Sequence, residues 1–214
     1  MSRKQHFPQG LYGITAEKFS CGRSNREVVE KMIAGGIDLI QYREKRPHKS
    51  FGAMLEECKT IRQLTRRASI PFIINDYVDI ALMVDADGVH IGQDDFPVAE
   101  VRRLVGPDKL IGVSTHNPEQ ASAAIKDGAD YIGVGPIFLT QTKDDVCDPV
   151  GLHYLDTVVS HFEVPFVAIG GIKETNMHEV LEHGATTLCM VTEIVGAEDI
   201  TAMVKKLKSI IKLG

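Results

Sequence analysis

The sequence lacks any long hydrophobic run and any excess of basic residues. Its apolar runs extend over only a few residues, whereas a helix that crosses a bilayer needs about 20. The N-terminal stretch MSRKQHFPQG has no apolar core of the kind that a signal peptide carries. The net charge is −5, which argues against nucleic acid as the main partner. We therefore expect a cytoplasmic protein that binds neither membrane nor nucleic acid, and whose anion-binding sites are built locally.

Clustered metal-binding residues are also missing. The two histidines closest in sequence, His178 and His183, are five positions apart and so do not share one helix face. The four cysteines are widely separated and form no CxxC pair, so the sequence suggests neither a disulfide framework nor a zinc site: Cys21, Cys58, Cys147 and Cys189. We expect reduced, mostly structural cysteines and no histidine metal site.

Short apolar segments alternate with longer amphipathic segments along the chain. The short segments are apolar along nearly their whole length, which is typical of parallel strands that helices cover on both faces. Strands are predicted at residues 11–15, 39–44, 71–75, 88–92, 110–115, 131–136, 165–171 and 187–192.

The segments between these strands carry helix signals. Ser24 with Glu27 forms a capping box, and Asn117 followed by Pro118 is typical of a helix start. Residues 200–211 place their apolar side chains on one stripe. The pattern predicts the α/β class and a (β/α)8 TIM barrel in a single domain of residues 1–214, with an open doubly wound sheet as the alternative.

Polar side chains follow the second predicted strand at every second position of QYREK. Gln41, Arg43 and Lys45 would project from the same side of an extended segment. Function collects at the carboxyl ends of barrel strands, so two cations and an amide would face one point there. Pairing with neighbouring acids on the surface is the alternative.

Carboxylates follow the third and fourth predicted strands. Asn75 and Asp76 end the run PFIIND, and Asp95 lies in GQDD. Mg2+ takes one or two protein carboxylates and keeps water and substrate phosphates as its other ligands. We therefore predict Asp76 and Asp95 as Mg2+ ligands, with loop turns and helix capping as the alternative.

The stretch GPIFLTQTKDD after the sixth strand brings two hydroxyls and an ammonium together. Lys143 would join Arg43 and Lys45 at the end of the barrel that carries the carboxylates, and a diphosphate with Mg2+ would balance both sets of charges. Thr140 and Thr142 would then donate to phosphate oxygens or to a ligand ring. A loop with side-chain turns is the alternative.

A second anion site is predicted after the seventh and eighth strands. Gly170 and Gly171 allow backbone N–H groups to approach a phosphate, and Val191 and Thr192 lie at the matching end of the next strand. A tight turn would also explain the glycines. Ser114 closes the fifth strand, where a hydroxyl bonded to backbone is the simplest interpretation. Two phosphate sites of different kinds imply two substrates.

Taken in order, the motifs resemble those of the thiamine phosphate synthase family. They run from LYGIT through QYREK, IND, DGVHIGQDD, GVSTH, GADYIGVGPIF, TQTK and AIGGI to GAEDI, nearly the whole chain. The resemblance implies a (β/α)8 transferase with Mg2+ as cofactor. Its substrates would be 4-amino-2-methyl-5-hydroxymethylpyrimidine diphosphate and 4-methyl-5-(2-hydroxyethyl)thiazole phosphate, and its products thiamine phosphate and diphosphate.

The resemblance also implies a role for each matching residue. Gln41 and Ser114 would contact the pyrimidine, and Asp76 and Asp95 would hold Mg2+. The diphosphate ligands would be Arg43, Lys45, Asn75 and Lys143, and the thiazole phosphate ligands Thr140, Thr142, Gly171, Val191 and Thr192. Within this set, the catalytic groups would be Arg43, Lys45, Ser114 and Lys143.

Two departures from the family pattern stand out. Thr192, Glu193 and Ile194 replace the usual Ser-Ala-Ile, and a carboxylate beside a phosphate would repel it unless Glu193 points away. Leu139 replaces a frequent proline in the TQTK loop. The alternatives to a synthase are a TenI-like thiazole tautomerase, whose branch typically lacks the GQDD acid and the TxTK loop, and a noncatalytic barrel that binds a phosphorylated metabolite. Assembly into a homo-oligomer is compatible with the sequence.

Overall fold

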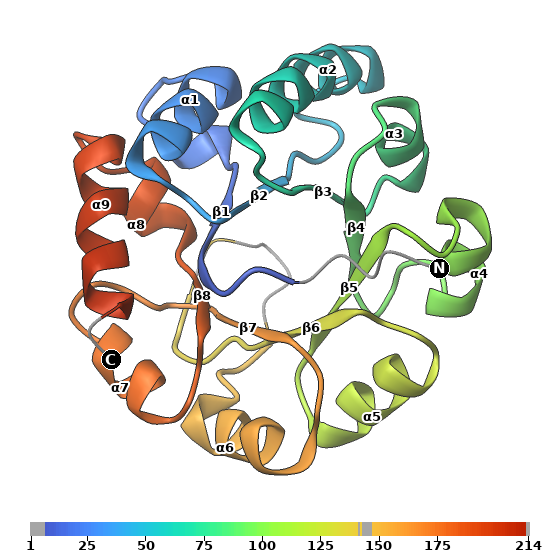
Figure 1. Cartoon of the computed structure of the whole chain (residues 1–214), viewed down its shortest axis with the longest axis vertical. Helices are drawn as coiled ribbons and strands as arrows, with labels where there is room; N and C mark the ends of the chain where they lie inside the picture. Colours follow the sequence, from blue (N-terminus) through green and yellow to red (C-terminus); the bar gives the residue numbers. More distant parts are fainter. Residues whose placement is uncertain (1–6, 141, 143–146, 213–214) are drawn as a thin grey trace.

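A closed barrel of eight parallel strands forms the centre of the molecule. The computed structural model describes residues 7–140, 142 and 147–212. The strands pair in chain order, and β8 pairs back with β1. Figure 1 looks down the barrel and shows the helices in a ring outside the strands. The predicted (β/α)8 barrel is confirmed, and the open doubly wound sheet is wrong.

The elements follow one another as strand and helix. The strands are β1 (Gly10–Ile14), β2 (Leu39–Tyr42), β3 (Phe72–Asn75), β4 (Gly88–Ile91), β5 (Leu110–Thr115), β6 (Tyr131–Val134), β7 (Phe166–Ile169) and β8 (Thr187–Cys189). A short 3-10 helix, η1 (Glu17–Phe19), lies between β1 and the first α-helix. The α-helices are α1 (Asn25–Gly35), α2 (Phe51–Ala68), α3 (Val78–Met83), α4 (Val98–Val105), α5 (Pro118–Lys126), α6 (Gly151–His161), α7 (Met177–Glu182), α8 (Val191–Val195) and α9 (Ile200–Ile211). None of these helices is both long and apolar enough to cross a bilayer, as far as the described residues extend.

Every predicted strand exists, but several were predicted too long at the carboxyl end. The predictions 39–44, 131–136, 165–171 and 187–192 run past the last residues of β2, β6, β7 and β8. Ladder pairing stops before the extended pattern of the sequence does, at charged residues after β2 and at glycines after β7. The largest error is at β8, because Val191 and Thr192 form the first turn of α8 and do not belong to the strand.

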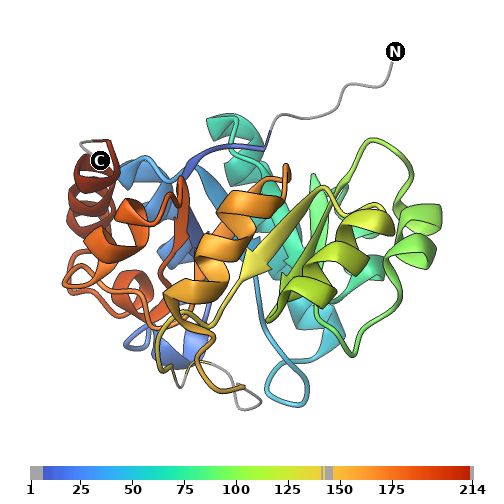
Figure 2. The ribbon, with the colours of Figure 1, turned by 90° about the horizontal axis from the view of Figure 1, so that it is seen from below.

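The barrel interior is filled by side chains from alternate strand positions. These residues are Phe7, Tyr12, Ile14, Leu39, Ile73, Leu110, Tyr131, Val167 and Cys189. The ring of Phe7 stacks on that of Tyr131 with 4.4 Å between centroids. Figure 2 shows the N-terminal segment entering at the end opposite the loops that follow β2 and β6. Phe7 therefore packs at the amino end and leaves the carboxyl end for a ligand.

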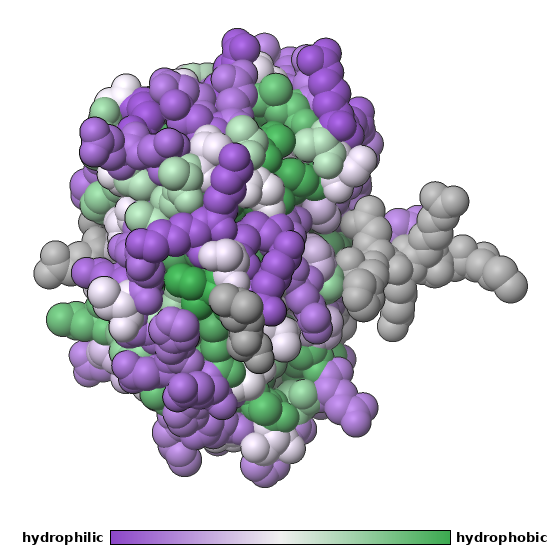
Figure 3. All heavy atoms as spheres, turned by 60° about the vertical axis from the view of Figure 1, so that its left-hand side comes forward, coloured by the Kyte–Doolittle hydropathy of each residue, from purple (hydrophilic) through white to green (hydrophobic). Residues whose placement is uncertain are grey.

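Helices form where the sequence signals predicted them. The Ser24 side chain accepts from the backbone N–H of Glu27, and the Asn117 side chain accepts from that of Gln120. The apolar stripe of α9 is buried, and the helix lies beside α1 in the outer ring. The face over α1 and α9 that Figure 3 turns forward is mostly hydrophilic, as expected for the outer side of amphipathic helices.

The N-cap of α9 offers a test of how this last helix is fixed. The carboxylate of Asp199 accepts from the backbone N–H of Ala202 at 3.0 Å. Asp199→Ala should lower the free energy of unfolding by about 1 kcal/mol, because a helix N–H loses its partner. Urea unfolding measures this change. Asp199→Asn keeps an acceptor and should be close to wild type, and an equal loss in both variants would contradict the capping role.

Candidate active site

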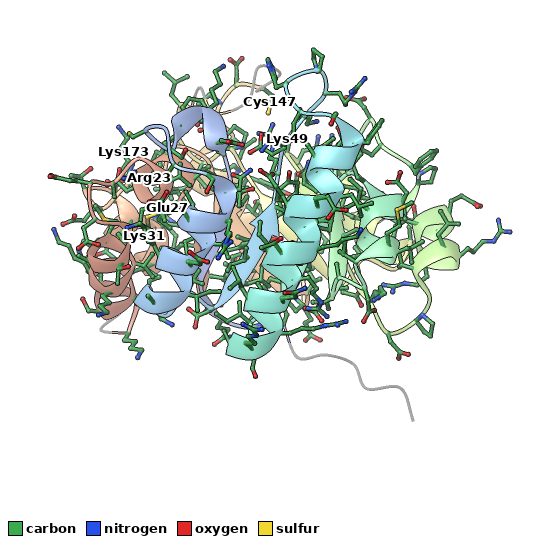
Figure 4. The ribbon with its side chains drawn as sticks, turned by 90° about the horizontal axis from the view of Figure 1, so that it is seen from above. Arg23, Glu27, Lys31, Lys49, Cys147 and Lys173 are labelled. Carbon is green, nitrogen blue, oxygen red and sulfur yellow. The ribbon has the colours of Figure 1, made fainter. Side chains whose placement is uncertain are left out.

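One cavity of about 600 Å³ opens at the carboxyl end of the barrel. All eight strands contribute lining residues. Figure 4 labels Cys147, Lys49 and Lys173 at this end of the molecule, and the first and last of these line the cavity. A smaller cavity of about 420 Å³ lies at the amino end, where Lys208 pairs with Asp38, and none of the described residues that the sequence assigned to the site lines it. The larger cavity is therefore the candidate site.

Every described residue that the sequence assigned to the site lines this cavity. These residues are Gln41, Arg43, Lys45, Asn75, Asp76, Asp95, Ser114, Thr140, Thr142, Gly171, Val191 and Thr192. Lys143 lies outside the described residues. The alternation predicted for QYREK places its polar side chains on the cavity side, although β2 itself ends at Tyr42.

Arg43 brings a cation into the cavity, and no acid among the described residues forms an ion pair with it. Its backbone N–H donates to the hydroxyl of Thr15 at 2.9 Å, which fixes the chain just after β2. Its Nε is buried, and no described residue accepts a hydrogen bond from it. Nε of Arg62 is buried in the same way, but that guanidinium donates through its other nitrogens to Asp87, whereas the Arg43 guanidinium has no acceptor among the described residues. An anion would complete such a group. The surface-pairing alternative for Arg43 therefore fails within the described chain.

Two carboxylates approach each other beside this cation. Asp76 has φ +60°, a left-handed conformation that is strained for a residue other than glycine. Its carboxylate is 15% exposed and lies 2.9 Å from Nζ of Lys45. Burial raises the pKa of Asp76, Lys45 opposes this rise, and the charge and hydrogen bond of Asp95 add to it. The two acids are thus close enough to repel each other.

Helix capping does not explain these acids. Tyr77 and Pro97 are the N-cap residues of α3 and α4, and neither helix start has a side-chain cap. Asp95 instead accepts from the backbone N–H of Gly92 at 2.7 Å, as a loop residue does. That contact holds Asp95 in place beside Asp76.

The loop after β6 carries the two predicted hydroxyls. Thr140 Oγ1 lies 3.0 Å from Thr142 Oγ1 and 3.4 Å from the backbone nitrogen of Thr142, so a side-chain turn forms as the alternative proposed. The loop packs on the end of β7. A Cβ on Gly171, which has φ +64°, would lie 2.6 Å from the carbonyl oxygen of Leu139. Glycine is needed there both for its conformation and for the close approach of the threonine loop.

Comparison with known proteins decides the family. A family model described as thiamine monophosphate synthase matches residues 11–194. A thiamine-phosphate synthase of Pelotomaculum thermopropionicum is 61% identical over 94% of this chain and 91% of that protein, and one of Lawsonia intracellularis is 54% identical over 95% and 93%. A solved thiamine phosphate pyrophosphorylase of Pyrococcus furiosus superposes with a TM-score of 0.87, at 36% identity over 96% of each chain. The chain belongs to the thiamine monophosphate synthase family. It is an enzyme of that kind.

Glu193, the departure from the family pattern, does not face the cavity. Its Oε1 accepts from the backbone N–H of Glu174 at 3.1 Å, so the carboxylate ties the first turn of α8 to the loop after β7. Glu193 is not among the cavity-lining residues, whereas its neighbour Thr192 is. The Glu193 carboxylate therefore points away from the cavity and would not repel a phosphate bound there.

The sequence missed polar side chains inside the barrel. His90 of β4 lines the cavity, and its Nε2 lies 2.9 Å from Oγ of Ser114. The expected backbone partner for the Ser114 hydroxyl is therefore wrong. Gln41 donates from Nε2 to the hydroxyl of Tyr12 at 2.8 Å. The sequence did carry a sign of this role for His90. It is a polar residue in an otherwise apolar strand, inside the family motif DGVHIGQDD.

The residues present fit a Mg2+ ion bound with few protein ligands. No group of three or more His, Cys, Asp and Glu side chains in the described chain could hold a metal. Two carboxylates that repel each other at the edge of an open cavity match Mg2+, which keeps several waters and binds substrate phosphates. The donor set is hard oxygen, without histidine or thiolate.

Arg43 gives a test that separates function from structure. Arg43→Met should leave the melting temperature unchanged or raise it, because the half-buried charge that is removed has no ion-pair partner among the described residues. The same variant should lower kcat/KM by about 30-fold or more, roughly 2 kcal/mol, if Arg43 binds a substrate anion. Thermal unfolding and steady-state kinetics measure the two effects.

Arg62→Met is the matched control. Arg62 donates to both carboxylate oxygens of Asp87, at 2.5 and 2.9 Å, and is 9% exposed. Its loss should destabilise the fold by about 3 kcal/mol, because the mostly buried carboxylate of Asp87 loses its cation and keeps only the backbone N–H of Phe72 as a described partner. If Arg43→Met destabilised the protein as strongly as Arg62→Met and left kcat/KM intact, Arg43 would be a structural residue.

Proposed function

We propose that the enzyme joins 4-amino-2-methyl-5-hydroxymethylpyrimidine diphosphate to 4-methyl-5-(2-hydroxyethyl)thiazole phosphate, giving thiamine phosphate and diphosphate. The family supports this reaction. The carrying observation is that Arg43, whose buried Nε has no acceptor among the described residues, lines the same cavity as the pair Asp76 and Asp95. A diphosphate that binds with a metal would supply the anion for Arg43 and the cation for the two acids.

The proposed chemistry needs charge stabilisation more than proton transfer. Departure of diphosphate from the pyrimidine methylene leaves a cation that the electron-rich ring delocalises, so no strong base is required. Arg43, Lys45, Asn75 and the undescribed Lys143 would stabilise the negative charge that builds up on the leaving group. Mg2+ held by Asp76 and Asp95, when bound, would add further neutralisation of that charge.

The second substrate would be held by the opposite rim of the cavity. Thr140 and Thr142 come from the loop after β6, and Gly171 follows β7. Val191 and Thr192 form the start of α8. Together they would fix the thiazole phosphate so that the ring nitrogen points at the pyrimidine methylene, and positioning of this kind accounts for a large share of the rate.

Two other activities remain as outcomes of a test. A TenI-like thiazole tautomerase would not need the GQDD acid or the TxTK loop, and this chain has both. A noncatalytic barrel would bind a phosphorylated metabolite without turnover. A cytoplasmic location and assembly into a homo-oligomer stay predictions from the sequence.

The direct assay incubates the purified protein with both substrates, with and without Mg2+, and measures thiamine phosphate and released diphosphate. We expect both products in equal amounts with Mg2+ and little of either without it. Product from neither condition, in protein shown to be folded by its thermal unfolding, would refute the synthase activity. Isomerisation of a thiazole substrate alone would point to the tautomerase.

The two predicted metal ligands can be tested by removing one charge at a time. Asp76→Asn and Asp95→Asn should each raise the Mg2+ concentration that gives half-maximal activity by about tenfold or more, since even outer ligands of metal sites have effects of this size. Asp79→Asn is the control. Asp79 is an exposed acid of α3 that binds the backbone N–H of Ile80 and does not line the cavity.

An equal shift in all three variants would show a general charge effect. An unchanged Mg2+ dependence in both Asp76→Asn and Asp95→Asn would remove these residues from the metal site.

A further inference from the structure

A chain of hydrogen-bonded side chains crosses the barrel interior from β2 to β5. Gln41 Nε2 donates to the hydroxyl of Tyr12, whose oxygen lies 3.0 Å from the hydroxyl of Tyr131. The Tyr131 hydroxyl lies 3.0 Å from Nδ1 of His90, and Nε2 of His90 lies 2.9 Å from Oγ of Ser114. Gln41 and Ser114, the two ends of the chain, line the cavity together with Tyr12 and His90, whereas the central residue Tyr131 is not among the lining residues.

The middle of the chain is held by tight packing. Tyr12 is 2% exposed and Tyr131 is fully buried. Burial is the main reason that the pKa of each tyrosine is raised, so both hydroxyls keep their protons. A Cβ on Gly112 of β5 would lie 2.1 Å from Cζ of Tyr131 and 2.5 Å from Nδ1 of His90. Only glycine leaves room at this position for the contact between the two rings.

The protons available on these side chains fix the order of donors and acceptors along the hydrogen-bond chain. Among the described residues, the Tyr12 hydroxyl has hydrogen bonds only with Gln41 and Tyr131. Since Gln41 donates to Tyr12, the Tyr12 proton must go to Tyr131, and the Tyr131 proton then goes to Nδ1 of His90. With Gln41 as the donor, any other arrangement leaves a buried hydroxyl proton without an acceptor, whereas a Gln41 amide turned over would reverse every hydrogen bond of the chain.

The direction determines what each end offers to a ligand. With Nδ1 as acceptor, neutral His90 carries its proton on Nε2 and donates to Ser114. Oγ of Ser114 therefore already accepts one hydrogen bond, and its own proton is available to the cavity. At the other end, the bond from Nε2 of Gln41 to Tyr12 fixes which way the amide faces and uses one of its two N–H protons, so the carbonyl oxygen is left as the acceptor for a ligand beside the second N–H.

We propose that this chain is a specificity device: Tyr12, Tyr131 and His90 are positioning residues that make Gln41 an acceptor and Ser114 a donor toward the pyrimidine. The inference rests on the proposed function, which places the pyrimidine against Gln41 and Ser114. A 4-aminopyrimidine offers an amino donor and ring-nitrogen acceptors, which complement these two ends. A 4-oxo analogue presents a carbonyl and a ring N–H in their place, and each would meet a group of the same kind.

The tautomer of His90 tests the direction without any substrate. The protein is labelled with 15N-histidine, and the His90 signals are assigned by their loss in His90→Gln. We expect a proton on Nε2 and none on Nδ1. A proton on Nδ1, or on both nitrogens, would mean that the chain runs the other way or is charged, and would overturn the proposal.

The specificity of single-hydroxyl variants tests the consequence. Tyr131→Phe keeps the ring and breaks the chain in the middle. The ratio of kcat/KM for the 4-aminopyrimidine diphosphate to kcat/KM for its 4-oxo analogue should fall by about tenfold. A change of this size is expected when one hydrogen bond to the substrate is lost. Tyr12→Phe breaks the neighbouring link and should act in the same direction, which keeps the test available if Tyr131→Phe folds poorly.

Tyr154→Phe is the matched control. Its hydroxyl is also buried and donates to Thr115 Oγ1 at 2.7 Å, but Tyr154 belongs to α6 and lies outside the barrel interior. Its loss should leave the ratio unchanged. An unchanged ratio in Tyr131→Phe and Tyr12→Phe would overturn the specificity role.

The two readouts separate this inference from the proposed reaction. If wild type makes no thiamine phosphate, the proposed function fails, and the tautomer measurement still decides the direction of the chain. If wild type is active but shows the opposite tautomer, the reaction stands and the specificity device is wrong.

Discussion

An imbalance of charge at one end of the barrel is the constraint on which the site depends. The guanidinium of Arg43 has a buried donor that no described residue accepts, and Asp76 and Asp95 lie close to each other with Lys45 paired to Asp76. A folded protein tolerates such groups only where the rest of the structure supplies the stability. Here the apolar interior and the ring of helices supply it, and a ligand with charges of both signs would complete the site.

The barrel assigns different tasks to different depths. Phe7 closes the amino end, the hydrogen-bonded Tyr12 and Tyr131 fill the middle, and charged groups lie at the carboxyl rim. Because adjacent parallel strands end at the same edge, residues far apart in sequence meet there. Asp76 follows β3 and Asp95 follows β4, and their loops need no helix cap to bring the acids together.

The barrel and most of the site could be predicted from the sequence, because the spacing of apolar residues differs between strands and amphipathic helices. The same spacing predicted that Gln41, Arg43 and Lys45 project to one side. The same spacing did not predict where the strands end on the carboxyl side. Val191 and Thr192 continue an apolar run but begin α8, and where backbone pairing stops depends on neighbours that the sequence does not display. The interior polar chain was missed for a related reason: Tyr12, Tyr131 and His90 stand singly in apolar strands, and only the closed barrel brings them into contact.

Binding of inorganic diphosphate, the proposed leaving group, tests the central claim most directly. Isothermal titration calorimetry would measure its affinity for the wild-type protein with and without Mg2+, at one fixed ionic strength. The charge imbalance predicts saturable one-to-one binding that is strengthened by Mg2+ and lost in Arg43→Met. Equal affinity in wild type and Arg43→Met, or no binding of diphosphate with Mg2+ present, would contradict it.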